Sequence, residues 1–391
     1  MRLDVSYLPG VKPLLHGFIH GGKDGVPAVE VFFDWLEGKK LDWSERVRLW
    51  PYVSAWAVVK KVLHIDPQKV EEIVLRKKEL INAARNVIDS VLEFGVKNPI
   101  VLRAPLVVYY ELAKGGDLHQ DKEIIRDMWQ SGVCMLEFVL PDAEIDDGYV
   151  TELVGYAREM GYGVAVWVRR QVEIDRLCLY VSAGVRSVEL SVDDLEGSRG
   201  YLLLLHDGLK RPIHVRLSLN RGVLASLEES LLWLFSEVAA ESVELVSAGQ
   251  DWSKEEMEEI FAVYRRLVGE GYYLVADSLL PQEYIGSLNE INTRFVRLSG
   301  SVGKKVWEYL GHTGEGRVWG YIDGQRKLYA SFDTNLPIGN LKGCSISELW
   351  YDHHAYSSET VEAETLLPSN PGSRFTCGGE ESPSSVGQGA G

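Results

Sequence analysis

The chain has 391 residues, of which 46% are hydrophobic and 25% are charged, a composition typical of a globular protein with a substantial core. Its 41 basic and 57 acidic residues give a formal net charge of −16, which argues against non-specific binding to nucleic acid or to an anionic membrane surface. No apolar stretch is long enough to span a membrane, the first residues do not resemble a secretory signal, and the four cysteines form no disulfide framework, so we expect a cytoplasmic location.

The N-terminal part of the chain predicts helices. Val29 to Glu37 predicts a short amphipathic helix, and Ser44 is placed to cap a second one. Asp66-Pro67 predicts the start of a longer helix that ends at Gly95, because Asp is a good cap and Pro fits the first helical position. We therefore expect residues 1–104 to form a mostly helical region.

Residues 105–299 alternate β-rich runs with amphipathic segments. Seven strands are expected, over Leu106 to Leu112, Val133 to Leu140, Gly163 to Val168, Val185 to Val192, Ile213 to Leu219, Ser242 to Ser247 and Tyr272 to Ala276. Helices are expected over Asp121 to Gly132, Gly148 to Gly161, Asp175 to Gly184, Leu224 to Ala239 and Ser253 to Gly269. Such repeats imply parallel crossovers, and no glycine-rich dinucleotide fingerprint supports an open doubly wound sheet. The sequence predicts an α/β fold, a partial parallel β/α barrel.

Residues 300–365 differ in character from the barrel. Val318 to Ile322 and Lys327 to Phe332 flank Asp323-Gly324, which is a strong hairpin signal. We expect a small C-terminal unit with one hairpin. Residues 366–391 are rich in Pro, Ser, Gly and Glu and predict a disordered tail.

The order of these elements resembles that of a radical S-adenosylmethionine (SAM) enzyme with the C-terminal extension called SPASM or twitch. The resemblance covers roughly residues 96–352 and is carried by Ile322-Asp323-Gly324, by Pro337 to Leu341 and by Ile346 to Trp350. It implies a [4Fe–4S] cluster held by three cysteines in a CxxxCxxC loop after the first strand, with SAM on the open iron.

The cysteines that this chemistry needs are missing. The loop after the first strand reads Ala113 to His119, without cysteine, and the four cysteines lie more than thirty residues apart, at 134, 178, 344 and 377. We therefore predict neither the cluster nor SAM as a cofactor, no metal site and no radical SAM chemistry.

Sites in barrels of this kind lie at the carboxyl ends of the strands, where the βα loops converge. A ligand is therefore expected near Glu111, Lys114, Glu137, Asp142, Arg169, Ser191, Asp193 and Asn220, and no catalytic residue is assigned. The alternative for Asp142 is a role at a helix start, and for Ser191 and Asp193 it is capping of a strand end.

Two main hypotheses on function follow from the sequence. The first is a cluster-free, radical-SAM-like protein that acts as a non-catalytic binding or accessory subunit, with an active radical SAM enzyme or its substrate protein as partner. The alternative is an enzyme with altered chemistry that binds a small molecule or SAM at the barrel mouth. A third hypothesis, a structural interaction protein, rests on the eleven tryptophans.

Overall fold

The fold is seen in a computed structural model. It describes residues 28, 31, 40–50, 78–94, 101–247, 249, 251–276, 279–281, 284, 287, 288, 290–292, 297–299, 314, 316–332, 334–351 and 353. The predicted helix at Val29 to Glu37, the predicted helix start at Asp66-Pro67 and the predicted tail at 366–391 lie outside these residues.

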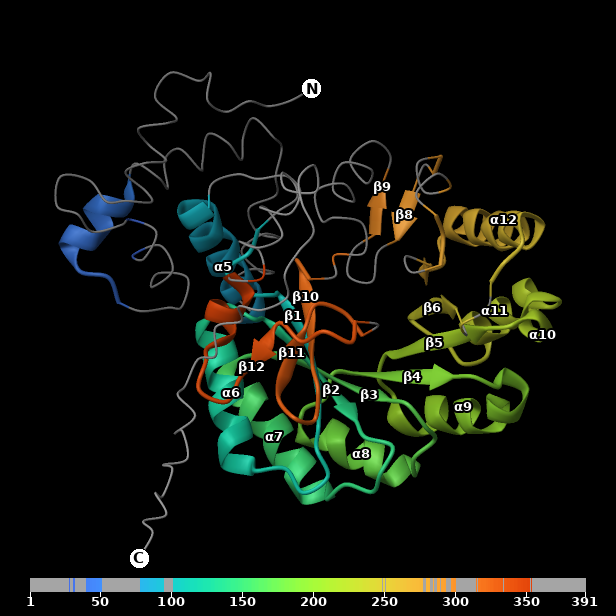
Figure 1. The fold of residues 1–391 in the computed structure, drawn as a ribbon, viewed down its shortest axis with the longest axis horizontal. Helices are drawn as coiled ribbons and strands as arrows, with labels where there is room; N and C mark the ends of the chain where they lie inside the picture. The colour runs from blue at the N-terminus through green and yellow to red at the C-terminus, as the bar shows by residue number, and fades with distance from the viewer. Residues whose placement is uncertain are drawn as a thin grey trace, which may run out of the picture.

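A curved sheet of ten strands forms the centre of the molecule, with helices α6–α9 along one of its faces (Figure 1). Its strands are β1 (Val107–Glu111), β2 (Met135–Leu140), β3 (Gly163–Val168), β4 (Ser187–Val192), β5 (Ile213–Leu219), β6 (Ser242–Ser247), β7 (Leu274–Val275), β10 (Trp319–Ile322), β11 (Lys327–Tyr329) and β12 (Gly339–Asn340). A separate antiparallel pair consists of β8 (Glu290–Asn292) and β9 (Arg297–Ser299). The helices are α5 (Lys78–Phe94), α6 (Leu118–Gln130), α7 (Asp147–Met160), α8 (Ile174–Ala183), α9 (Leu195–Leu209), α10 (Arg221–Leu224), α11 (Leu227–Ser236) and α12 (Lys254–Glu270).

The strand order is β12-β11-β10-β1-β2-β3-β4-β5-β6-β7, and the eight strands from β10 to β7 are parallel. Strand β10 pairs with β1 although it comes more than two hundred residues later in the chain. Among the described residues, no hydrogen-bonded ladder joins β7 to β10. The prediction of a partial parallel β/α barrel is therefore confirmed.

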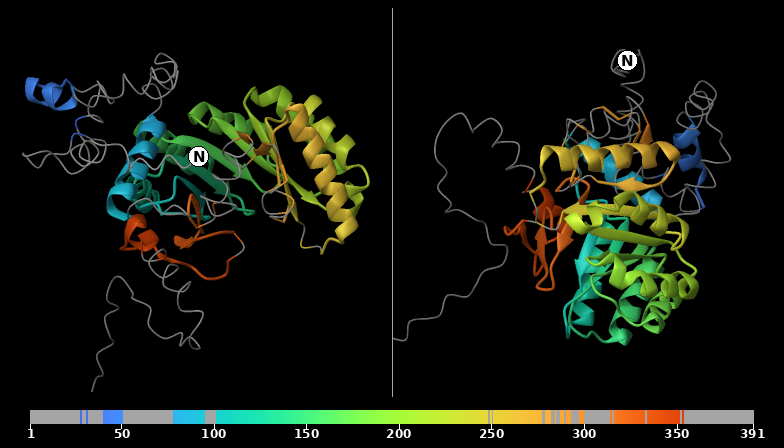
Figure 2. Two further views of the ribbon diagram at one scale, coloured as in Figure 1. Left: turned by 90° about the horizontal axis from the view of Figure 1, so that it is seen from above. Right: turned by 90° about the vertical axis from the view of Figure 1, so that its right-hand side faces the viewer.

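The predicted hairpin is also confirmed. Strands β10 and β11 pair in antiparallel fashion around the turn at Asp323 and Gly324. The pairing of β10 with β1 makes this hairpin an extension of the barrel sheet (Figure 2). The bounds proposed for the four regions of the chain remain predictions.

The helices begin where local signals place them, with four differences from the prediction. Helix α6 begins at Leu118 and not at Asp121, because Asp117 caps it. Ser253 and Glu256 form a capping box at the start of α12, where the sequence predicts a helix start. Helix α9 was not predicted; Asp194 caps it by accepting from the backbone N–H of Gly197. The predicted helix from 224 to 239 is shorter and forms α11 (Leu227–Ser236), and the separate short helix α10 (Arg221–Leu224) precedes it. The helix over residues 43–50 is capped by Asp42, not by Ser44, because the Asp42 carboxylate accepts from the N–H of Glu45.

Alternation along the strands separates the two faces of the sheet. In β5 the residues at 213, 215, 217 and 219 are buried against the helices, while those at 214, 216 and 218 are only partly buried. The same period of two runs through the neighbouring strands. We call the face turned away from α6–α9 the inner face. None of the described helices combines the length and the apolar composition that a membrane span requires.

A buried carboxylate fastens the hairpin to the barrel. Asp121 of α6 accepts hydrogen bonds from the hydroxyls of Tyr110 and Tyr149 and pairs with Arg326 Nε at 2.8 Å. Burial, with the charge of Asp121, raises the pKa of Tyr110, so this hydroxyl keeps its proton and donates. The aspartate thus joins β1, α6, α7 and the hairpin turn.

Candidate functional site

The inner face has an aromatic part on β10, β1 and β3. Tyr109, Trp167 and Trp319 are buried there, and Phe332, which follows β11, packs on all three. The ring centroid of Phe332 lies 4.9 Å from that of Tyr109, 5.1 Å from that of Trp167 and 5.0 Å from that of Trp319. This part of the face is therefore filled by packed rings.

The part of the inner face on β4, β5 and β6 is charged and carries small side chains. Arg216 of β5 lies between two carboxylates: its Nε is 3.5 Å from Glu189 on β4 and 3.2 Å from Glu244 on β6. The small side chains are those of Ser187, Ser191, Ser218 and Ser242. These small side chains lie on the same face as the charged row of Glu189, Arg216 and Glu244.

Arg216 is held in place by rings as well as by charge. Its guanidinium carbon lies 4.4 Å from the ring centroid of Trp167 and 5.3 Å from that of Phe332, both within cation–π range. The side chain is only 13% exposed. Among the described residues, its Nη1 is buried and has no hydrogen-bond partner, which is uncommon for a charged donor.

A second charged group lies where β1 and β3 end. Arg169 Nη2 is 2.9 Å from Glu111 Oε2, and the hydroxyl of Tyr321 donates to the same carboxylate oxygen. Burial, followed by the hydrogen bond to Glu111, raises the pKa of Tyr321, so the phenol remains protonated. Arg169 also lies over Trp167, with 5.2 Å between the guanidinium carbon and the ring centroid. Trp167 therefore contacts both arginines.

The structure brings together part of the predicted site. Glu111 and Arg169 form the ion pair described above, and Glu137 is buried on β2. Ser191 accepts a hydrogen bond from Trp167 Nε1 at 2.8 Å, and Asp193 accepts one from Ser218.

The other three predicted residues lie apart from this group. Lys114 is exposed in the β1–α6 loop. Asp142 is exposed and pairs with Arg170 at 3.2 Å. Asn220 caps α10, where its side chain accepts from the N–H of Val223.

Sequence reasoning missed the residues at the centre of the site: Glu189, Arg216, Glu244 and Tyr321. The available signal was the alternation in Ile213–Leu219, where every second residue is polar, as in Ser187–Val192 and the first residues of Ser242–Ser247. Strands of a barrel whose outer face is covered by helices turn such polar positions inward. This alternation places the polar residues of the three strands on the inner face, and the strand register decides which of them meet.

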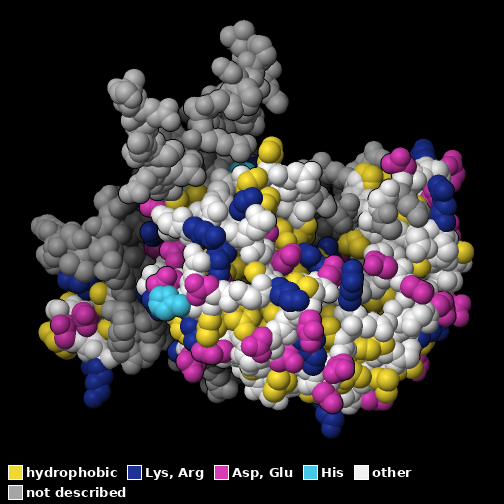
Figure 3. All heavy atoms as spheres, turned by 60° about the horizontal axis from the view of Figure 1, so that its bottom comes forward, with side chains coloured by type: hydrophobic (Ala, Val, Ile, Leu, Met, Phe, Trp, Pro, Cys, Tyr) yellow, Lys and Arg dark blue, Asp and Glu magenta, His cyan; other side chains and the backbone are white. Residues whose placement is uncertain are grey.

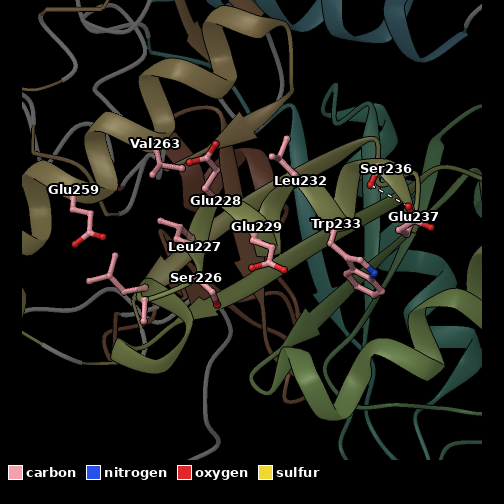
Figure 4. A pocket seen from close by; sticks show the side chains of 12 residues that line it. Ser226, Leu227, Glu228, Glu229, Leu232, Trp233, Ser236, Glu237, Glu259 and Val263 are labelled. Atoms are coloured by element: carbon pink, nitrogen blue, oxygen red, sulfur yellow. Dashed lines mark hydrogen bonds between the residues drawn. The ribbon is translucent and has the colours of Figure 1, made fainter.

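A cavity of about 620 Å³ lies elsewhere, between α10, α11 and α12 on the helical layer (Figure 4). Its walls carry Glu228, Glu229, Glu237 and Glu259 together with Leu232 and Trp233. We place the candidate site on the inner face, because the little-exposed charged row of Glu189, Arg216 and Glu244 lies there. The face of the molecule shown in Figure 3 mixes acidic and basic side chains.

No group of three or more His, Cys, Asp or Glu side chains in the described part of the chain is arranged to hold a metal ion. No disulfide joins the three described cysteines: Cys134 is buried just before β2, Cys178 lies in α8, and Cys344 follows β12. They lie in three separate elements.

The chain was compared with known proteins. No protein-family model and no curated protein matches its sequence. Among solved structures, the citrate synthase SbnG is 13% identical and has a TM-score of 0.33 over 54% of this chain and 91% of its own. The YdjI aldolase from Escherichia coli is 10% identical, with a TM-score of 0.31 over 44% of this chain and 66% of its own. A dihydrodipicolinate synthase from Agrobacterium tumefaciens is 10% identical, with a TM-score of 0.30 over 45% of this chain and 72% of its own.

These findings correct two predictions. The similar structures reported above are a citrate synthase, an aldolase and a dihydrodipicolinate synthase and not radical SAM proteins, so the predicted resemblance is wrong. The interpretation as a cluster-free accessory subunit depended on that resemblance and is wrong as well. At TM-scores near 0.3 we draw nothing about activity from these neighbours, and the function must be argued from the inner face.

Proposed function

We propose that the chain is an enzyme that binds a small carbonyl compound on the inner face and moves a proton at the carbon beside the carbonyl. The observation that carries the proposal is that Nη1 of Arg216 is buried and donates no hydrogen bond to any described residue. A buried donor without an acceptor costs about 1–3 kcal/mol. A ligand oxygen at this position supplies the missing acceptor.

The charges around Arg216 suit this chemistry. Removing a proton beside a carbonyl places negative charge on the carbonyl oxygen, and a fixed guanidinium N–H stabilises that charge. The carboxylates of Glu189 and Glu244 flank the same guanidinium from β4 and β6. Either carboxylate can accept the proton and return it, as a general base and then a general acid.

The surroundings favour a small ligand. The rings of Trp167 and Phe332 hold the guanidinium in one orientation, so little reorganisation is needed when charge develops. The net charge of −16 disfavours nucleic acid as a partner. The described cysteines form no disulfide with one another, which suits the cytoplasmic location that we propose for this enzyme.

The test is deuterium exchange. The full chain is incubated in D₂O with pyruvate, 2-oxobutyrate, 2-oxoglutarate or dihydroxyacetone, and loss of the proton signals beside the carbonyl is followed by NMR. We expect at least one compound to exchange faster with the protein than with buffer. The Arg216→Met variant should lose that acceleration, and Glu189→Gln or Glu244→Gln should lower it by about 10²-fold or more.

Arg170→Met is the matched control, because it removes an exposed arginine next to Arg169 whose partner Asp142 is also exposed. It should exchange like the wild type. Exchange at the buffer rate for the whole panel, or equal acceleration by the wild type and Arg216→Met, would overturn the proposal.

A further inference from the structure

A histidine and a serine form a hydrogen-bonded pair on the inner face. His214 Nδ1 of β5 lies 2.7 Å from Ser242 Oγ of β6. Both residues are only partly buried. The strand register places Glu189 of β4 directly beside His214, and His214 directly beside Ser242. A carboxylate, an imidazole and a hydroxyl thus stand in one row across three adjacent strands.

The pair is chemically suited to nucleophilic catalysis. A serine hydroxyl is a weak nucleophile until a neighbouring base takes its proton, and a histidine within hydrogen-bond reach is the usual base. A nucleophile and its base are identified by this geometry and not by their order or spacing along the chain. With its proton on Nε2, His214 accepts the hydroxyl proton of Ser242 through Nδ1.

We infer that Ser242 is a nucleophile activated by His214 and that it takes the acyl group of a small ester or thioester. Ser242 Oγ forms a bond to the acyl carbon while its proton moves to His214 Nδ1. The bond from the acyl carbon to the leaving oxygen or sulfur breaks, and His214 returns the proton to the leaving group. Water then releases the acid from Ser242 by the same steps in reverse order, so the cycle consumes one water and needs no oxidant or reductant.

This inference does not depend on the proton-transfer proposal. That proposal requires the Arg216 guanidinium and a flanking carboxylate, whereas acyl transfer requires the hydroxyl of Ser242 and the ring of His214. The two therefore fail in different variants.

The experiment is covalent labelling of the full chain with a rhodamine-tagged fluorophosphonate. Intact mass should show one adduct per chain, and peptide mapping should place it on Ser242. Ser242→Ala should abolish the adduct. His214→Gln should slow labelling at least 10-fold, because no base remains for the hydroxyl proton.

Ser182→Ala is the matched control. Ser182 is exposed on α8, and its hydroxyl donates to the carbonyl oxygen of Cys178 instead of an imidazole, so this variant should label like the wild type. Thermal unfolding by circular dichroism identifies any variant that fails to fold. If His214→Gln unfolds, His214→Asn takes its place.

Three results would overturn the inference: no adduct on the folded wild type, an adduct that persists in folded Ser242→Ala, or equal labelling rates for the wild type and the folded His214 variant. Two cross-checks separate this inference from the first proposal. Ser242→Ala should retain deuterium exchange, and folded Arg216→Met should still carry its adduct on Ser242.

Discussion

Replacing Arg216 by Met should destabilise the fold far more than replacing an ordinary surface arginine. The substitution leaves the carboxylates of Glu189 and Glu244 without the guanidinium that lies 3.5 and 3.2 Å from them. All three side chains are at most 14% exposed, so water screens the lost charge little. Removing one partner of a buried ion pair costs about 3–5 kcal/mol. Methionine retains part of the packing on Trp167 and Phe332, so we expect a loss of about 3 kcal/mol.

The assay is urea unfolding at pH 7, followed by circular dichroism. Adding Glu189→Gln and Glu244→Gln to Arg216→Met removes the two carboxylate charges that face Arg216 in the wild type and should recover at least half of the loss. Arg170→Met is the matched control: its ion pair with Asp142 is 72% and 50% exposed, so its loss should stay below about 1 kcal/mol. Equal losses in the two arginine variants, or no recovery in the triple variant, would refute the reasoning.

Two further predictions concern Asp121, which pairs with Arg326 of the C-terminal hairpin, and His353. Asp121→Asn should lower the free energy of unfolding by about 3–5 kcal/mol, because Arg326 is 11% exposed and loses its buried carboxylate. Asp142→Asn is the exposed control for the same urea experiment, and a similar loss in both variants would contradict this role of Asp121. Burial, with Arg317 nearby, lowers the pKa of His353 below its ordinary value of 6.5. The unfolded chain then binds this proton more readily, so stability should fall as the pH drops below about 6.5, and His353→Gln should reduce that fall in melting curves between pH 7 and 5. An unchanged pH dependence in the variant would exclude His353 as its source.

Local signals explain the parts of the fold that the sequence predicted. The seven barrel strands follow from short β-rich runs, and the hairpin follows from Asp323-Gly324 between two such runs. The start of α12 at Ser253 was likewise predicted from a few neighbouring residues, and the structure shows a capping box there. Helix α9 was not predicted because Gly197 and Gly200 lie inside it. Each glycine makes a helix about 1 kcal/mol less stable than alanine does.

Contacts between distant segments could not be predicted in the same way. Strand β10 pairs with β1 although the two strands lie far apart in the chain. No residue pattern in either strand identifies the other as its partner. Glu111 and Arg169 were predicted because both stand at strand ends. Glu189 and Glu244 were not, because their meeting with Arg216 depends on the register of three strands. The predicted resemblance to radical SAM enzymes was wrong because it was based on the order of weak motifs. It was not based on the cysteines that bind the cluster.

The measurement that tests the central claim most directly is side-chain NMR of arginine in the ¹⁵N-labelled full chain. The guanidinium signal of Arg216 is assigned by its loss in Arg216→Lys. During titration with the carbonyl compounds that undergo exchange, this signal should shift and saturate, while that of Arg170 stays in place. A titration in which the signal of Arg216 does not move, although one of these compounds is being exchanged, would show that the buried Nη1 is not where the ligand binds.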